Sequence, residues 1–267
     1  MRSFYHPAFK RQRILEWYDW LAQLSADRDD WTMMNYGLVW SVERDGPLPP
    51  RLPEHLAERL SAQLYYKVAT LDGPIADKDV LEVGSGRGGG ANFLFPRLNP
   101  SAYVGLDRAP SAVALANARH AQPGLRYVVG DAEQLPFDPG SFDAVINVES
   151  CHAYGSSARF LREVRRVLRP GGAFLFCDFW PAAEVADLRA EMEAAGLVIE
   201  HAADITSEVL AALDERAPLL DQEMRAAVPA DKLDAFRAFC VMPGTLPYAA
   251  FKTRSELYVL CRARAPA

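Results

Sequence analysis

A glycine-rich loop is the clearest chemical feature of this 267-residue chain. Five of the seven residues at 84–90 are glycines, and they follow a short, largely apolar run at 79–83. Glycine has no Cβ, so such a loop can turn sharply and let a ligand approach its backbone. We therefore expect a strand, a tight turn and the start of a helix here, with a cofactor against the loop.

The glycines alone leave the identity of that cofactor open. Residues 84–89 satisfy the G-x-G-x-x-G fingerprint of dinucleotide-binding proteins, and Asp107 follows about 20 residues later, where a ribose-binding acid belongs. Glu82, two residues before the first glycine, and three later segments are needed to separate the possible cofactors.

Two other polar residues have the chemistry for proton transfer. His152 follows a predicted strand at 142–148, and a histidine titrates near neutral pH, as a general base should. Asp178 ends a predicted strand at 173–178, where a carboxylate must be paired or face a cavity, because an unpaired buried charge is costly. The alternative for each is an ordinary structural hydrogen bond.

Alternating strands and helices must position these residues. The apolar runs predict seven strands, at 79–83, 103–107, 125–131, 142–148, 173–178, 197–200 and 257–261. Helical patterns lie between them and before them, at 54–71, from 91 onward, and at 111–121, 157–168 and 182–195. This order predicts an α/β fold with a doubly wound, mostly parallel sheet, helices on both faces and ligands at the carboxyl ends of the strands.

Two further regions are expected to add to this core. The sequence divides into an N-terminal helical cap, a core, a helical lid insertion before the last strand, and the last strand with its tail, at residues 1–75, 76–203, 204–254 and 255–267. Large apolar side chains of these regions, together with Trp180 of the core, are candidates to line an acceptor pocket, namely Trp31, Tyr36, Trp40, Trp180, Phe239, Met242 and Tyr248. The alternative is that they only pack the cap onto the core.

Composition argues against several classes of partner. A net charge of −6 and a pI near 5.5 argue against a nucleic-acid-binding surface. The four cysteines form no C-x-x-C pair, so neither a zinc site nor a disulfide framework is expected. The chain has no apolar run of 18 residues and no signal peptide, and we expect a cytoplasmic protein without membrane insertion. A homodimer remains open.

Four segments together resemble a known family. They are Glu82-x-Gly84-x-Gly86-x-Gly88, Asp107, the run 130–137 (GDAEQLPF) and the run 168–172 (LRPGG). They look like the motifs of class I S-adenosylmethionine-dependent methyltransferases. Within that superfamily the chain is similar to phthiotriolone/phenolphthiocerol-type and antibiotic-sugar O-methyltransferases, and the first similarity extends to residues 34–36, 147–154 and 205–210.

The resemblance implies a Rossmann-like core that binds S-adenosylmethionine and releases S-adenosylhomocysteine. It implies that the loop at 84–88 approaches the methionine part, that Asp107 accepts hydrogen bonds from the ribose hydroxyls, and that Asp131 and the backbone of Ala132 meet the adenine. The full implied set is Glu82, Gly84, Ser85, Gly86, Gly88, Asp107, Arg108, Asp131, Ala132, Glu133, Asn147 and Glu149.

The resemblance also implies a reaction. We expect methyl transfer to a hydroxyl of a small, largely apolar secondary metabolite, such as a polyketide, phenolic or glycosylated antibiotic precursor, with His152 as general base. In the similar sugar O-methyltransferases, a histidine and an aspartate with the separation of His152 and Asp178 are the proposed catalytic pair. Asp178 would orient His152 or bind the acceptor hydroxyl.

Other reactions stay open on the same fold. The acceptor atom could be nitrogen or carbon, or the protein could be a non-methylating cyclase in which the sulfonium serves as structure or electrostatics. A nicotinamide-dependent oxidoreductase is disfavoured by the later motifs. No metal is expected, because the adjacent carboxylates of metal-dependent O-methyltransferases are missing: Glu149 stands alone and Asp178 precedes Phe179 and Trp180.

Overall fold

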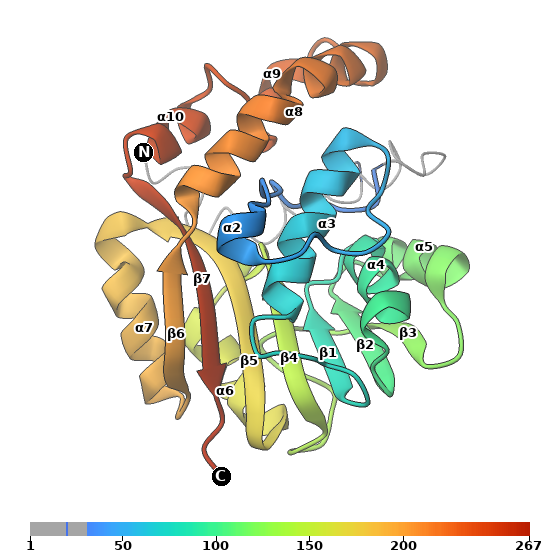
Figure 1. Ribbon diagram of the computed structural model, residues 1–267, viewed down its shortest axis with the longest axis vertical. Helices are drawn as coiled ribbons and strands as arrows, with labels where there is room; N and C mark the ends of the chain where they lie inside the picture. The colour runs from blue at the N-terminus through green and yellow to red at the C-terminus, as the bar shows by residue number, and fades with distance from the viewer. Residues whose placement is uncertain (1–19, 21–30) are drawn as a thin grey trace.

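Seven strands form one sheet in the computed structural model, which describes Trp20 and residues 31–267 (Figure 1). From one edge to the other their order is β3 (Leu125–Val129), β2 (Ala102–Asp107), β1 (Asp79–Val83), β4 (Phe142–Val148), β5 (Leu168–Pro181), β7 (Glu256–Arg264) and β6 (Val198–Asp204). The part of the predicted cap at 1–19 and 21–30 lies outside the described residues.

The strand directions put several loops on one edge of the sheet. Strands β3, β2, β1, β4 and β5 run parallel, whereas β7 is antiparallel to both β5 and β6. The carboxyl ends of the five parallel strands therefore share one edge, which is the place where α/β proteins bind ligands. The predicted mostly parallel, doubly wound sheet is confirmed.

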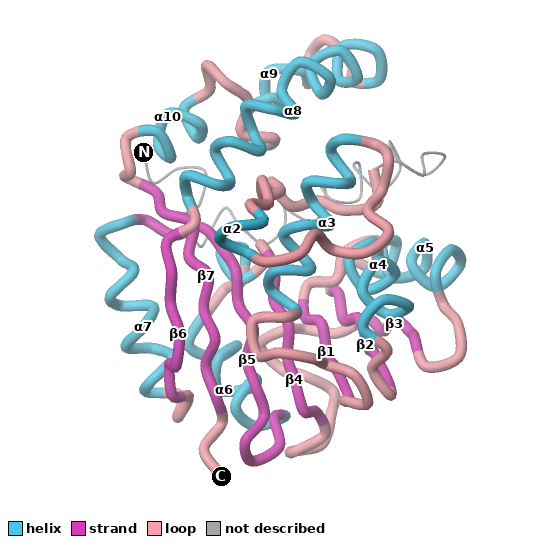
Figure 2. Tube along the Cα trace, in the orientation of Figure 1, coloured by secondary structure: helices cyan, strands magenta, loops and turns pink. Residues whose placement is uncertain are grey.

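Helices cover both faces of the sheet (Figure 2). On one face, α3 (Leu56–Ala69), α4 (Gly89–Leu98) and α5 (Pro110–His120) share an apolar cluster with β1 and β2. On the other, α6 (Ser157–Val167) and α7 (Val185–Ala194) share a second cluster with β4 and β5. Helix α6 shows why: its buried residues recur every three or four positions and form one apolar stripe.

The segment between β6 and β7 is helical, as its sequence predicts. It contains α8 (Thr206–Ala227), α9 (Leu233–Phe239) and α10 (Leu246–Lys252), which lie above the carboxyl edge of the sheet in Figure 1. A small apolar cluster of α8, α9 and neighbouring loops, with Trp20 and Trp31 packed against it, holds this region together. Three short helical turns complete the description, α2 (Val42–Asp45), η1 (Cys151–Ala153) and η2 (Ala182–Glu184).

Most element boundaries differ from the sequence prediction by a few residues, and the largest difference is at the start of β5. Strand β5 begins at Leu168, whereas the prediction placed 168 in a helix and the strand start at 173. Helix α6 ends at Val167 because Leu168 pairs with Phe142 of β4, and the register then shifts before Ala173 pairs with Ala144. The shift between the two pairings accommodates the proline and glycines at 170–172 within the strand.

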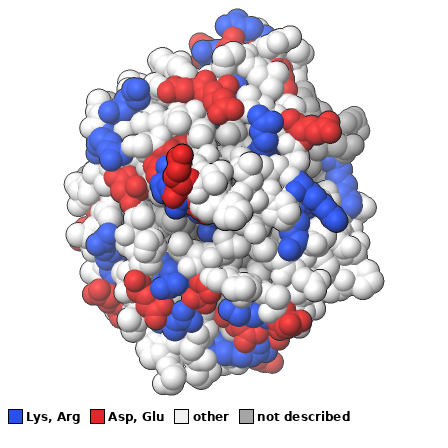
Figure 3. Space-filling model, in the orientation of Figure 1, with Lys and Arg blue, Asp and Glu red and all other residues white. Residues whose placement is uncertain are grey.

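Charge on the molecular surface is mixed. On the face drawn in Figure 3, Lys and Arg side chains are interspersed with Asp and Glu. No helix in the described part of the chain is both long and apolar enough to cross a membrane.

Candidate active site

A cavity of about 140 Å³ lies at the carboxyl edge of the sheet. Its wall comes mainly from the loops that follow β1, β2, β3 and β4, at residues 84–87, 106–109, 130–133, 148–150 and 153–155. Residues 32–35 cover it from the N-terminal region, and Tyr65 of α3 completes the wall. We call this cavity the strand-end pocket.

Asp107 ties two sides of the strand-end pocket together. One carboxylate oxygen, Oδ2, accepts a hydrogen bond from the Gly86 N–H (2.8 Å), and Oδ1 accepts from the Ala109 N–H (2.9 Å). Burial raises the pKa of Asp107 even though backbone N–H groups favour its ionised form. A carboxylate has about four lone-pair sites, so Asp107 keeps capacity to accept hydrogen bonds from ligand hydroxyls.

The loop after β3 adds a second group of polar residues to the wall. Asp131 Oδ1 accepts from the Glu133 N–H (2.9 Å), and Glu133 Oε1 accepts from the Gly155 N–H (2.8 Å). Ala132 and Arg108 line the same cavity. These contacts fix the loop after β3 against the loop that follows β4.

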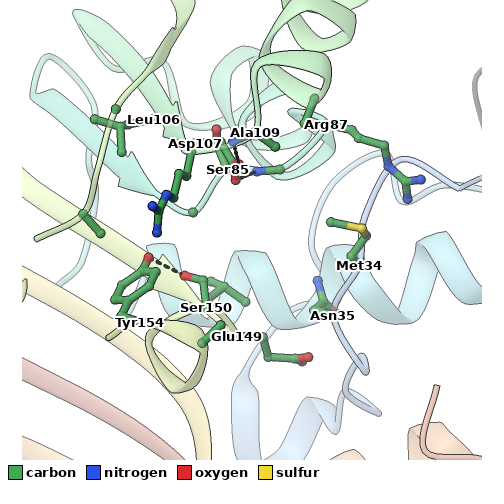
Figure 4. Close-up of a pocket in the computed structure, with 18 of the residues that line it drawn as sticks. Met34, Asn35, Ser85, Arg87, Leu106, Asp107, Ala109, Glu149, Ser150 and Tyr154 are labelled. Atoms are coloured by element: carbon green, nitrogen blue, oxygen red, sulfur yellow. Dashed lines mark hydrogen bonds between the residues drawn. The ribbon is translucent and has the colours of Figure 1, made fainter. Parts of the chain in front are cut away.

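Glu149 brings an unusual buried carboxyl to the strand-end pocket. Its backbone is left-handed (φ 46°), a conformation that is costly for a residue with a Cβ and that recurs at functional sites. Its Oε1 accepts from the Tyr36 N–H (2.6 Å), and the Tyr258 hydroxyl also donates to it. Burial raises the pKa of Glu149 to about 8. In Figure 4 it lies apart from Asp107, on the side of Ser150 and Asn35.

The wall fits a polar, positively charged ligand. Ser85 Oγ is buried and has no hydrogen-bond partner among the described residues, although Ser85 lines the cavity. Buried hydroxyls are normally paired, so this one is available to a ligand. The carboxylates of Asp107 and Glu149 supply acceptors for hydroxyl and ammonium groups.

Three residues of the implied cofactor set do not line the strand-end pocket. Along β1 the side chains alternate between faces, so Glu82 points to the α3 face, where the hydroxyls of Tyr65 (3.0 Å) and Tyr103 (2.9 Å) donate to it. Gly88 packs against Tyr127, whose ring carbon would lie 2.7 Å from an added Cβ.

Asn147, the third, is buried below the loops. Its amide donates to the Val83 carbonyl (2.9 Å) and to Ser150 Oγ (2.7 Å), and so joins the loop after β1 to the loop after β4. The implied residues that do line the cavity are Gly84, Ser85, Gly86, Asp107, Arg108, Asp131, Ala132, Glu133 and Glu149.

His152 and Asp178 are brought together at the same edge. His152 Nδ1 lies 2.8 Å from Asp178 Oδ1, and the His152 backbone N–H donates to Oδ2 (3.0 Å). The contact forms because β4 and β5 are adjacent and parallel, so the residues after β4 meet the end of β5. Asp178 is fully buried, and the imidazole lies against the Phe179 ring with a centroid distance of 4.2 Å.

This arrangement sets the chemistry of the imidazole. With Nδ1 donating to the carboxylate, Nε2 is the nitrogen that can accept a proton. His152 is absent from the wall of the strand-end pocket, but the flanking Ser150 and Ala153 belong to it. The charge of His152 also acts on Glu256 of β7, whose pKa is raised by burial and lowered in part by the imidazole.

A second, smaller cavity of about 80 Å³ lies between α3, α8, α9 and the residues at 31–36. We call it the helical pocket. Trp31, Tyr36 and Phe239, which were predicted to line an acceptor pocket, lie in its wall together with Leu220 and Phe236. Both pockets include residues 33–35 and Arg87, so the two cavities adjoin across this segment.

Four predicted acceptor-pocket residues lie elsewhere. Trp40 donates to the Gly46 carbonyl (2.9 Å), and Tyr248 donates to Asp214 Oδ1 (2.6 Å), so both are engaged away from the two pockets. Met242 is buried in the cluster of α8 and α9. Trp180 packs on the α6 and α7 face because side chains alternate along β5, and its neighbour Phe179 faces Tyr36 instead.

Sequence reasoning did not single out several residues of these walls. Arg216, Glu58 and Phe236 of the helical pocket come from helices whose pattern is that of ordinary amphipathic segments, so no local signal marked them. Ser150 and Tyr154 lie in a run already noted for its resemblance, which is the one signal that could have identified them. Among the described residues, no three His, Cys, Asp or Glu side chains are grouped as metal ligands.

Known proteins resemble the chain in both sequence and structure. The model of a family described as a methyltransferase domain matches residues 81–176. A probable phthiotriol/phenolphthiotriol dimycocerosates methyltransferase 2 of Mycobacterium ulcerans is 39% identical over 209 residues, which are 78% of this chain and 81% of that protein. The chain belongs to this methyltransferase family.

Other relatives and solved structures extend the comparison. A phthiotriol/phenolphthiotriol dimycocerosates methyltransferase of Mycobacterium tuberculosis is 40% identical over 77% of this chain and 76% of its own length. A fatty-acid O-methyltransferase of Mycolicibacterium smegmatis is 38% identical over 76% of this chain and 72% of its own. The structure of the [4+2]-cyclase SpnF has a TM-score of 0.73 at 21% identity, covers 96% of each chain and shows the shared fold.

The methyltransferase is therefore of class I, and its cofactor is S-adenosylmethionine. The dinucleotide reading of the glycine loop is set aside, because the family and not the loop decides the cofactor.

Proposed function

We propose that this methyltransferase transfers a methyl group to a hydroxyl oxygen of a small, largely apolar acceptor, with His152 as general base. The contact between His152 Nδ1 and the fully buried Asp178 carries the proposal. When bound, S-adenosylmethionine supplies a methyl group already activated by its positively charged sulfur. A hydroxyl acceptor must lose its proton as it attacks, so the chain must provide a base.

His152 and Asp178 divide that task. Asp178 accepts a hydrogen bond from the Nδ1–H group and orients the ring, while Nε2 accepts the proton of the acceptor hydroxyl. The charge that then develops on the imidazole is stabilised by the buried carboxylate. Phe179 against the ring fixes its position and keeps water away from that face.

The strand-end pocket is the proposed cofactor site. Asp107 would accept hydrogen bonds from the ribose hydroxyls, and Asp131 with Ala132 would meet the adenine. Residues 84–87 and Glu149 would hold the methionine end, where a bound ammonium group would lower the raised pKa of Glu149 and favour its ionised form. The cofactor would not contact Glu82, Gly88 or Asn147. These residues would hold the loops of the pocket in place.

The helical pocket is the proposed acceptor site. Its aromatic and aliphatic walls favour an apolar acceptor, such as a polyketide or another lipid-like metabolite. The names of the relatives support this class, since they refer to dimycocerosates and to fatty acids. In this proposal α8, α9 and α10 serve as a lid over the carboxyl edge, with the N-terminal segment as a cap.

A transfer assay tests the proposal. The protein is incubated with methyl-labelled S-adenosylmethionine and a panel of hydroxylated polyketides, phenols and lipid alcohols, and both labelled ether and S-adenosylhomocysteine are expected by mass spectrometry. We expect His152→Ala to lower kcat by about 100-fold or more without changing S-adenosylhomocysteine affinity. His201→Ala, on the exposed edge strand β6, is the matched control.

The outcomes separate the alternatives. Methylation of an amine or a carbon, at a rate that His152→Ala leaves unchanged, would replace the proposed acceptor and remove the base. A product formed without S-adenosylhomocysteine would point instead to a cyclase on the methyltransferase fold.

A further inference from the structure

Arg216 is a buried cation of the helical pocket that makes no ion pair among the described residues. It lies on α8, is 6% exposed and forms part of the pocket wall. Its Nη1 donates to the Asn35 carbonyl (3.2 Å) and its Nη2 donates to the Cys240 carbonyl (3.1 Å). Both partners are neutral, so neither balances the charge of the guanidinium.

The guanidinium also keeps unused donors. A guanidinium has five N–H groups, and the two carbonyls account for two of them. Its Nε is buried and has no hydrogen-bond partner in the described part of the chain. A planar group with unused donors can bind the oxygens of a carboxylate or a phosphate.

Two carboxyl groups in the surroundings of Arg216 are engaged elsewhere. Glu58 lines the same pocket, but its oxygens accept hydrogen bonds from the Thr32 N–H and hydroxyl (both 2.7 Å) and from the Met33 N–H (3.2 Å). Glu149 is close enough for Arg216 to act on its charge, yet it belongs to the strand-end pocket, and its raised pKa of about 8 leaves it largely protonated at neutral pH.

The charge of Arg216 has no acidic partner in the pocket wall. Among the described residues of this wall Glu58 is the one acidic residue; it interacts with Arg87, and its oxygens accept hydrogen bonds from Thr32 and Met33. The remaining wall is neutral and largely apolar, with Leu220, Phe236 and Trp31 prominent. A buried charge without a counter-charge costs free energy, and an anionic ligand would remove that cost.

We propose that the helical pocket binds the oxyanion group, a carboxylate or a phosphate, of an apolar acceptor, with Arg216 as its main ligand. The inference rests on the proposed function in that it takes the acceptor to be apolar and to occupy this pocket. The apolar part of the ligand contacts the aromatic wall. Because the pocket adjoins the strand-end pocket across residues 33–35, the anchored acceptor lies next to the cofactor site.

Binding measurements test the assignment without methyl transfer. The full chain, saturated with S-adenosylhomocysteine, is titrated with decanoate, decyl phosphate and 1-decanol in a calorimeter. We expect decanoate or decyl phosphate to bind about tenfold or more tightly than decanol, since a hydrogen bond to an ionised group is stronger than one to a neutral hydroxyl. The ranking of the two anions shows which oxyanion the site prefers.

Variants of Arg216 decide whether it is the cause. Arg216→Met should abolish the preference for the anion while decanol affinity stays within about twofold, and Arg216→Lys should retain part of the preference. Arg225→Met is the matched control on the same helix, because Arg225 is exposed and pairs with Asp221. A role confined to joining residues 35 and 240 would lower the melting temperature of the variants but leave the affinity ratio unchanged.

Clear results would overturn the proposal. Equal affinities of wild-type protein for decanol and both anions would do so, and so would an undiminished anion preference in Arg216→Met. If Arg216→Met does not fold, Arg216→Lys and Arg216→Gln are compared instead, each checked by its S-adenosylhomocysteine affinity. An anion preference without methyl transfer to any acceptor would refute the proposed function and leave this site standing. Methyl transfer without an anion preference would refute this site and leave the proposed function standing.

Discussion

The strand-end pocket and the helical pocket are built in different ways. The wall of the strand-end pocket comes mainly from loops at 84–155, each carried by the end of a strand in one hydrogen-bonded sheet. The wall of the helical pocket combines residues 31–36, 57–61 and 216–240, which are joined by side-chain packing. The shared fold supplies the first pocket, and additions to the fold supply the second.

This difference separates the effects expected from substitutions. A change in the strand-end pocket should alter cofactor affinity, and a change in the helical pocket should alter acceptor affinity. The His152 and Asp178 pair stands outside both walls and should alter the rate of transfer.

After the loss of His152 itself, the largest effect is expected at Asp178. Asp178→Asn should lower kcat for a hydroxyl acceptor by about 100-fold, because the amide no longer fixes the Nδ1–H form of His152 or balances its charge. Steady-state kinetics across pH measure the loss, and the affinities of both pockets should stay within about twofold. The exposed Asp187 provides the control, Asp187→Asn. If cofactor affinity falls by as much as kcat, the role of Asp178 is instead to keep the carboxyl edge of the sheet folded.

A smaller effect is expected at Asp107 and should be confined to the cofactor. Asp107→Asn removes a charged acceptor from the wall and should weaken S-adenosylhomocysteine binding by about 30-fold, measured by calorimetry. Decanoate binding should not change, and Asp138→Asn, at an exposed position, should change neither. If Asp107→Asn weakened both S-adenosylhomocysteine and decanoate binding, the two pockets would not act as separate binding sites.

A substitution of Phe236 tests whether a change in the helical pocket leaves cofactor binding unaffected. The ring is 3% exposed and stacks on Trp31 in the helical pocket. Phe236→Leu should raise the KM of an apolar acceptor by about fivefold through lost apolar contact, with unchanged S-adenosylhomocysteine affinity. Phe142→Leu, buried at the start of β4, controls for loss of core packing. An equal rise of KM in the control would contradict the assignment.

The smallest effect concerns pH and the two buried carboxyls Glu149 and Glu82. Burial raises the pKa of Glu149 to about 8 and that of Glu82 to about 7, from an ordinary value of 4.5. The native chain therefore keeps protons that the unfolded chain releases above about pH 4.5. The free energy of unfolding that these protons contribute is fully present below that pH, falls as the pH rises and is lost above about pH 8.

Urea unfolding without cofactor at several pH values measures this contribution. Glu149→Gln should flatten the fall between about pH 5 and about pH 8, by up to about 1.4 kcal/mol for each pH unit. Glu54→Gln, at an exposed site, should leave the profile as it is. The prediction would be wrong if the free energy of unfolding rose with pH in the wild-type protein and this rise were absent from the Glu149 variant.

Particular residues show how far the sequence could be interpreted. The position of Asp107 after the second strand placed it in a pocket wall, because parallel strands bring their carboxyl ends to one edge. The same logic brought His152 to Asp178. Trp180 was misplaced because its face depends on the register of β5, and a shift by one residue gives Phe179 the position near His152.

Glu82 and Arg216 show what only the folded chain reveals. The motif around Glu82 suggested contact with the cofactor, but its carboxyl accepts hydrogen bonds from the hydroxyls of Tyr65 and Tyr103. No local sequence pattern distinguishes these two roles. Arg216 meets Asn35 across 181 positions of sequence, so nothing nearby in the chain marks it as buried.

The sequence by itself determined the order of strands and helices, the glycine turn and the edge at which the polar residues gather. These follow from periodicity and backbone preferences, which act over a few residues. Only the tertiary structure decided which side chains face each pocket, how the helical pocket closes and that Arg216 is buried there. Those outcomes depend on how helices dock on the sheet, and docking is set by packing between residues far apart in the chain.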